Sequence, residues 1–180
     1  MPAQYTFYMK NTLVVAALCI LALVVGAWLY FTHTSPATRA ETAPAAVATA
    51  RDVEVTVLDS GTTARTYAVR KNYAIYDAAK FAEIWKAVHG ADAKVPTVDF
   101  TKEYVLAVFA GEKPTGGYGI QVARVNDTDA ARMIGIELTV PGAGCMMSKA
   151  KTEPYEFVSV PATGPLTLEH RDVTVTKSCN

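Results

Sequence analysis

Residues 104–110 read YVLAVFA, and this apolar stretch decides which folds the chain can form. Side chains of an extended strand alternate between two faces, so a strand that is apolar on both must be covered on both. We therefore expect a central strand here. The patterns of three further segments predict strands: VEVTV at 53–57, which alternates as a half-exposed strand does, YEFVSV at 155–160 and DVTVT at 172–176.

A β-hairpin is expected downstream of the central strand. Two alternating apolar runs flank the polar sequence NDTDA at 126–130, which is typical of a hairpin turn. The residues that share a face are Tyr118, Ile120 and Val122 before the turn, and Ile134, Ile136, Leu138 and Val140 after it.

One amphipathic helix is predicted over residues 77–89, with Asp77 as its N-cap and Gly90 as its stop. Because no second helix is available for βαβ crossovers, the economical fold is α+β: a mostly antiparallel β-sheet or open barrel with one helix. The apolar face of the helix consists of Phe81, Ile84, Trp85 and Val88.

Residues 12–31, TLVVAALCILALVVGAWLYF, contain no charge. At about 1.5 Å per residue this segment spans a hydrocarbon core of about 30 Å, so it predicts a transmembrane anchor in contact with membrane lipid. Tyr30 and Phe31 occupy the place of a small-residue cleavage site, which favours retention of the anchor.

The domain organisation follows from this anchor. Residues 1–11 are expected to form a short cytoplasmic segment, since Lys10 favours the inside. Residues 32–50 are rich in Ala, Thr and Pro and predict a flexible linker. Residues 51–180 then form an extracytoplasmic domain, so the protein is expected in the cytoplasmic membrane as a single-pass protein with this domain in the periplasm or at the cell surface.

Charge and motifs exclude several functions. The 17 basic and 17 acidic residues leave no basic excess for binding nucleic acid. The motifs of serine hydrolases, zinc proteases, P-loop proteins and dinucleotide-binding proteins are missing, so we expect no catalytic residue, cofactor or metal site. Asn126, Asp127 and Asp129 fit a polar hairpin turn better than a calcium loop, and Asp99 fits a turn or capping residue.

Two cysteines lie in the expected domain. In an oxidising compartment, a disulfide between Cys145 and Cys179 is predicted, which would stabilise the fold by about 3–4 kcal/mol. The alternative is a thiol hydrolase in which Cys145 is a nucleophile activated by His89 or His170.

The sequence EKPTGGYGIQV at 112–122 is the candidate for partner binding. Pro114 restricts φ, Gly116 and Gly117 permit positive φ, and the backbone amides of such a loop are expected to stand free for a partner. The alternative is a structural turn in which Tyr118 packs as the first strand residue.

Four motifs in order carry a family resemblance: PTVDF at 96–100, YVLAVFAGEKPTGGYGIQV at 104–122, PGAGC at 141–145 and PYEFVSVP at 154–161. Together they resemble the PrcB C-terminal domain, found in accessory subunits of a bacterial surface protease complex. The resemblance implies a non-catalytic exported protein, often membrane-attached, that binds a partner such as a protease. Family members can be lipoproteins, whereas this chain has no good lipobox and would attach through its helix.

The resemblance also identifies candidate partner-binding positions. These matching residues are Lys113, Pro114, Thr115, Gly116, Gly117 and Tyr118, with Asp99 and Phe100 upstream. PTGGY at 114–118 is in addition similar to the PTTGY loop of chagasin-like inhibitors of cysteine proteases, which implies protease inhibition as an alternative function.

Overall fold

The computed structural model of the protein describes residues 50–164 and 166–179. The predicted cytoplasmic segment at 1–11, the anchor at 12–31 and the linker up to residue 49 lie outside this range. Among the described residues, none forms a helix that combines the length and the apolar content needed to cross a membrane.

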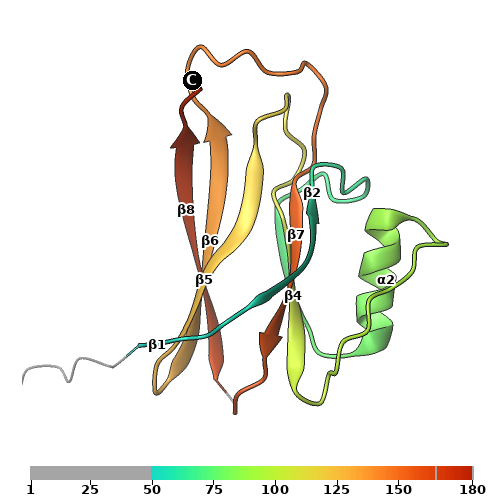
Figure 1. Ribbon diagram of the computed structural model, residues 1–180, viewed down its shortest axis with the longest axis vertical. Coiled ribbons are helices and arrows are strands. Elements are labelled where there is room, and N and C mark those ends of the chain that lie inside the picture. The colour runs from blue at the N-terminus through green and yellow to red at the C-terminus, as the bar shows by residue number, and fades with distance from the viewer. Residues whose placement is uncertain (1–49, 165, 180) are drawn as a thin grey trace, which may run out of the picture. The chain divides into compact units, whose positions relative to one another are not determined.

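The described residues form two four-stranded sheets (Figure 1). The sheet that we call the outer sheet has the order β1-β5-β6-β8, and the one that we call the central sheet has the order β2-β7-β4-β3. The outer sheet consists of β1 (Arg51–Asp52), β5 (Gly119–Asp127), β6 (Ala131–Pro141) and β8 (Thr167–Lys177). The central sheet consists of β2 (Thr56–Gly61), β3 (Lys71–Ile75), β4 (Glu103–Phe109) and β7 (Tyr155–Pro161).

The prediction of a central strand at 104–110 is confirmed by β4, which lies between β7 and β3 and is apolar on both faces. Leu106 and Val108 face the outer sheet, where they pack in one core with Ile136 of β6. Val105 and Phe109 face the opposite way, into a second core beneath the helix. The central sheet is therefore the middle of three layers.

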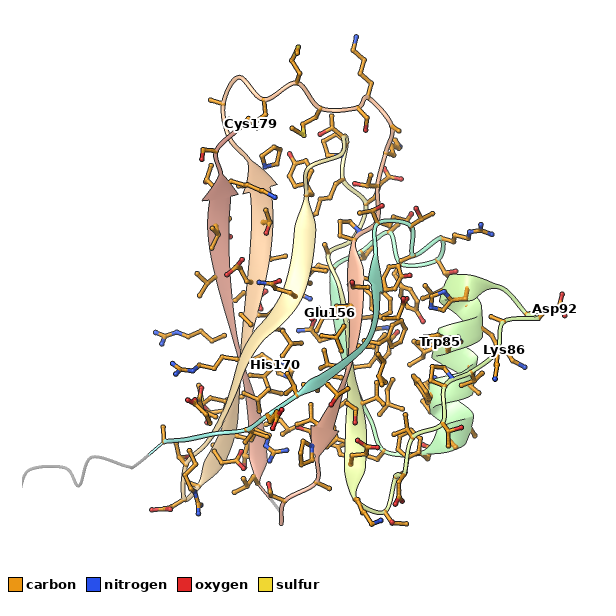
Figure 2. All side chains as sticks on the ribbon, viewed as in Figure 1. Trp85, Lys86, Asp92, Glu156, His170 and Cys179 are labelled. Atoms are coloured by element: carbon orange, nitrogen blue, oxygen red, sulfur yellow. A yellow bond between two sulfur atoms is a disulfide. The ribbon has the colours of Figure 1, made fainter. Side chains whose placement is uncertain are left out.

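The predicted helix is also confirmed, as α2 (Ala78–His89). The Asp77 carboxylate accepts a hydrogen bond from the amide of Lys80 at 2.8 Å, and Gly90 ends the helix with φ at 103°. The four predicted apolar residues, Trp85 among them, are buried against the central sheet (Figure 2). This helix closes the face of the central sheet that the outer sheet leaves open.

The predicted open barrel is wrong, because neither sheet of the described residues closes. The sheets are mostly antiparallel, as expected, but β6 and β8 run parallel in unbroken register from Ala131↔Thr167 to Pro141↔Lys177. Between these two strands the chain adds β7 to the central sheet. The connection from β6 to the parallel strand β8 thus passes through β7 of the central sheet and contains no helix.

The prediction for 53–57 is wrong in its boundaries. β1 ends at Asp52 and β2 begins at Thr56, and between them the chain crosses from the outer sheet to the central sheet. Val53 and Val55 pack in the core between the sheets, so their alternation reflects burial along the crossing segment. The hairpin of β5 and β6 is confirmed, with Val122 opposite Ile136.

A buried arginine ties this hairpin to the crossover between β7 and β8. Arg132 is 2% exposed, and its Nε and Nη2 donate to the two carboxylate oxygens of Asp127 at 2.6 and 2.8 Å. Its Nη1 donates to the carbonyl of Pro161 at 2.6 Å and to the Tyr104 hydroxyl at 3.2 Å, and its Nη2 also donates to Thr163 Oγ1 at 2.6 Å. The hydrogen bonds that Arg132 donates to its carboxylate lower the pKa of Asp127.

Removal of the Asp127 carboxylate should leave the Arg132 charge buried without its counterion. We expect Asp127→Ala to lower the free energy of unfolding by about 3–5 kcal/mol, measured by urea denaturation of the purified protein. The matched control is Asp129→Ala in the exposed part of the same turn, which should change stability by less than about 0.5 kcal/mol. Equal effects of the two substitutions would contradict the role assigned to the Arg132–Asp127 pair.

Candidate functional site

The predicted partner-binding loop follows β4 and packs against the segment that precedes β7. Lys113 and Thr152 exchange backbone hydrogen bonds, from Lys113 N to Thr152 O at 2.7 Å and from Thr152 N to Lys113 O at 3.0 Å. The Gly116 amide donates to the carbonyl of Ser148 at 3.1 Å, and Thr152 Oγ1 donates to the carbonyl of Thr115 at 2.8 Å. The loop is therefore held along its length by residues 148–152.

These contacts correct the expectation that the loop amides stand free. The amides of Lys113 and Gly116 bond to the neighbouring segment, and that of Glu112 donates to the carbonyl of Ala68 at 2.8 Å. A partner cannot use these three donors without breaking bonds within the domain. What the loop does expose is the side chain of Pro114, with Lys113 and Tyr118 half-buried.

Packing explains both glycines of the loop. A Cβ on Gly116 would lie 2.8 Å from Ser148 Oγ. Gly117 has φ at 84°, and a Cβ there would overlap Met147 Sδ and lie 3.2 Å from Pro141 Cβ. A side chain at Gly116 would displace that of Ser148, and one at Gly117 would displace that of Met147. Gly117 also requires a backbone conformation that other residues rarely adopt.

A cavity of about 600 Å³ lies beside the loop, and we call it the loop cavity. Gly117, Tyr118 and Gly119 form one wall, and the end of β6 and the C-terminal side of β8 form the others. The remaining lining residues are Thr62, Thr139, Pro141, Met147, Lys177, Ser178 and Cys179. The structure thus places two of the predicted partner-binding residues, Gly117 and Tyr118, in the wall of a surface cavity.

The predicted disulfide is confirmed and forms part of this site. Cys145 and Cys179 are bridged, with their Cα atoms 5.5 Å apart, and the amide of Gly142 donates to the carbonyl of Lys177 at 2.9 Å. Together these bonds hold residues 177–179 against the turn that follows β6. One wall of the loop cavity therefore depends on the bridge.

The same bridge removes the free thiol that the hydrolase hypothesis requires. Neither proposed base is placed to activate Cys145. His89 lies on α2 in contact with Trp85, and its Nε2 is 3.2 Å from Asp59 Oδ2. Figure 2 shows His170 well separated from Cys179 along β8.

Asp99 and Phe100 lie in the turn before β4, whereas the loop follows β4, so the structure does not bring them together. Asp99 accepts hydrogen bonds from the Thr101 hydroxyl and amide and pairs with Lys102 at 3.0 Å. The hydrogen bond from the Thr101 hydroxyl, followed by that from Lys102, lowers the pKa of Asp99 to about 2. Asp99 is thus a turn residue, as expected, and Phe100 packs against Phe81.

No group of three or more metal-binding side chains occurs within residues 50–164 and 166–179. The segment compared with a calcium loop is a hairpin turn, since the amide and hydroxyl of Thr128 both donate to the carbonyl of Ala131, at 2.8 and 2.9 Å. Both carboxylate oxygens of its Asp127 accept hydrogen bonds from the Arg132 guanidinium.

Sequence reasoning missed Glu156, a buried carboxyl between the two sheets (Figure 2). Its Oε2 accepts a hydrogen bond from the amide of Val122 at 2.6 Å, at the point where the register of β5 shifts before Arg124. Burial raises the pKa of Glu156, and the hydrogen bond from Val122 opposes this only in part. The sequence feature that could have identified this buried carboxyl is one acidic residue in a mostly apolar strand.

The domain is thus a three-layered α+β module whose accessible feature is a loop beside a disulfide-bounded cavity. A family model described as PrcB C-terminal matches residues 104–161, from the start of β4 to the end of β7, with the loop inside the match. This confirms the family resemblance over that segment. Comparisons with curated proteins and with solved structures found no match.

The packing of Gly117 predicts a specific cost for a methyl group. Gly117 and Gly144 both have φ at 84°, but a Cβ on Gly144 would have no atom within 4 Å. Gly144→Ala should therefore cost only the backbone strain of about 1–2 kcal/mol, and Gly117→Ala should cost more because of Met147. Thermal unfolding of both variants measures the difference, and equal losses would show that the contact with Met147 carries no energy.

The raised pKa of Glu156 predicts how stability depends on pH. The folded state holds the proton more tightly than the unfolded state, so this carboxyl reduces stability as the pH rises from its ordinary pKa of 4.5 through the raised value. Glu156→Gln keeps an acceptor for the Val122 amide and cannot ionise. The variant should gain stability relative to the wild type between acidic and neutral pH, measured by urea denaturation, and a constant difference would contradict this.

Proposed function

We propose that this protein is a membrane-anchored, non-catalytic module that works outside the cytoplasm. In this proposal it binds an exported protein, such as a protease, as an accessory subunit of its complex. Residues 12–31 would anchor it as a single-pass protein, and residues 32–50 would hold the domain away from the bilayer. The observation that carries the proposal is the match to the PrcB C-terminal family. The matched residues, 104–161, include the loop.

The shape and chemistry of the loop cavity support binding. Of the described residues that line it, Lys177 alone has a charged side chain, while Tyr118, Pro141 and Met147 present apolar surface. Such a lining suits the burial of a partner's side chain better than it suits proton transfer. Beside it, Met146 is 98% exposed, and methionine and aromatic side chains are enriched in the cores of protein interfaces.

The rigidity of the site also supports binding. The backbone of the loop is tied to Ser148 and Thr152, and the wall opposite is tied by the disulfide. A surface that is ordered before it meets its partner loses little conformational entropy on association. The loop would therefore act through its shape and its exposed side chains, while its amides maintain the fold.

The test is crosslinking and co-purification of the full-length protein from native membranes, followed by mass spectrometry. Substitution of Gly116 and Gly117 would be ambiguous, because a side chain at either position would also displace Ser148 or Met147. Lys113→Glu instead reverses a charge on the loop, and Lys94→Glu, in the exposed segment after α2, is the matched control. Recovery of an exported partner should fall about tenfold for Lys113→Glu, equivalent to about 1.4 kcal/mol, and should be unchanged for Lys94→Glu.

A second variant tests the cavity itself. Thr139→Phe places a large side chain over Gly119, where the Thr139 Cβ is 3.4 Å from the position of a Gly119 Cβ, and phenylalanine is favourable in a strand. The variant should fold and lose the same partner. If both variants recover the wild-type set of proteins, the loop and cavity are not the contact surface.

A further inference from the structure

The edge of the outer sheet at β8 is an unprotected surface. Within the described part of the chain, β8 pairs with β6 alone, so its other side presents unpaired N–H and C=O groups (Figure 1). Every residue from Glu169 to Lys177 is exposed. Strand edges of this kind are templates for pairing with another strand.

Of the other three edges, β3 has only five residues, and the remaining two are short or irregular. At the opposite side of the outer sheet, β1 has only two residues. In the central sheet, β2 is interrupted by a bulge between Val57 and Asp59. β8 has eleven residues, keeps one register along its length and contains no proline. It also exposes two valines on the solvent face of the outer sheet, Val173 at 52% and Val175 at 39%.

We propose that two copies of this chain pair through β8 in antiparallel orientation, joining their outer sheets into one continuous sheet. This dimer goes beyond the proposed binding of a partner and does not depend on it. We choose a second copy of the chain as the partner because, in one register, an acidic residue of one β8 lies opposite a basic residue of the other.

Geometry limits the registers that a two-fold dimer can use. Residues that lie opposite each other must point their side chains to the same face of the joined sheet, so the two-fold axis must pass between two copies of the same residue. An axis at Asp172 sets two carboxylates opposite each other, and an axis at Arg171 sets two guanidinium groups opposite each other. An axis at Thr174 opposes Arg171 and Lys177.

An axis at Val173 avoids these conflicts. It places Val173 opposite Val173 of the second copy and Glu169 opposite Lys177, with Val175 opposite the stem of Arg171. On the inner face Asp172 would lie opposite Thr174, and its carboxylate is already paired with Arg70 at 2.9 Å. Among the axes from Arg171 to Thr174, this one alone opposes no like charges, and it pairs residues 169–177.

Cysteine substitution tests the register directly in the full-length protein, with Cys19→Ser as background and the Cys145–Cys179 bridge left in place. Opposed residues have Cβ atoms about 4.5–5.5 Å apart, so Val173→Cys should form a covalent dimer under mild oxidation. Val175→Cys is the matched control, because its two copies would be offset by about 14 Å along the strands. A mixture of Val175→Cys and Arg171→Cys should form the heterodimer.

Charge reversal tests the complementarity. Glu169→Lys opposes like charges at both ends of the paired segment and should reduce the Val173→Cys crosslink about tenfold. The double variant Glu169→Lys with Lys177→Glu restores opposite charges and should restore the crosslink. The proposal is overturned if Val173→Cys remains monomeric, if Val175→Cys alone crosslinks equally well, or if charge reversal has no effect.

Discussion

The burial of the central sheet on both faces is the constraint on which the rest of the domain depends. β4 and β7 carry apolar side chains toward both sides, so neither face can be left to solvent. The outer sheet covers one face by packing on Leu106 and Val158, and α2 covers the other by packing Trp85 against Phe157. The three-layered arrangement is the consequence, and the loop cavity forms beside the start of β5 and the end of β6.

The contacts of the loop stabilise the fold and also hold the loop's side chains in place at the surface. Its glycines let the backbone approach Ser148 and Met147 closely, and its amides are used by Ser148 and Thr152. The chain thereby presents Pro114 and Tyr118 on a surface that cannot readily change shape. The disulfide fixes the opposite wall. One side of the loop cavity is therefore held by backbone hydrogen bonds and the other by a covalent bond.

Sequence patterns correctly predicted the features that depend on residues close to one another in the sequence. The spacing of Phe81, Ile84, Trp85 and Val88 identified α2, and the two-sided apolar run identified β4. The parallel pairing of β6 with β8 could not be predicted, because the strand that makes the crossover belongs to the other layer.

The candidate site was predicted less completely for the same reason. The sequence marks Gly116 and Gly117, but it does not reveal that their neighbours come from residues 147–148, which have no periodic pattern. Arg132 has no distinguishing pattern around it, and Glu156 is marked only as one acidic residue in a mostly apolar strand. The packed structure shows that both are buried. The pairing of Cys145 with Cys179 could be predicted because the described residues contain only these two cysteines.

The crossover between the layers also sets an order of events during synthesis. All four strands of the central sheet precede residue 162, so that sheet can be completed while β6 is still an edge. Only when residues 167–177 follow does β8 cover that edge, and only then does Cys145 meet the thiol with which it pairs. Formation of this bridge therefore requires that synthesis has passed the end of β8, and a chain interrupted before β8 lacks the cysteine that pairs with Cys145.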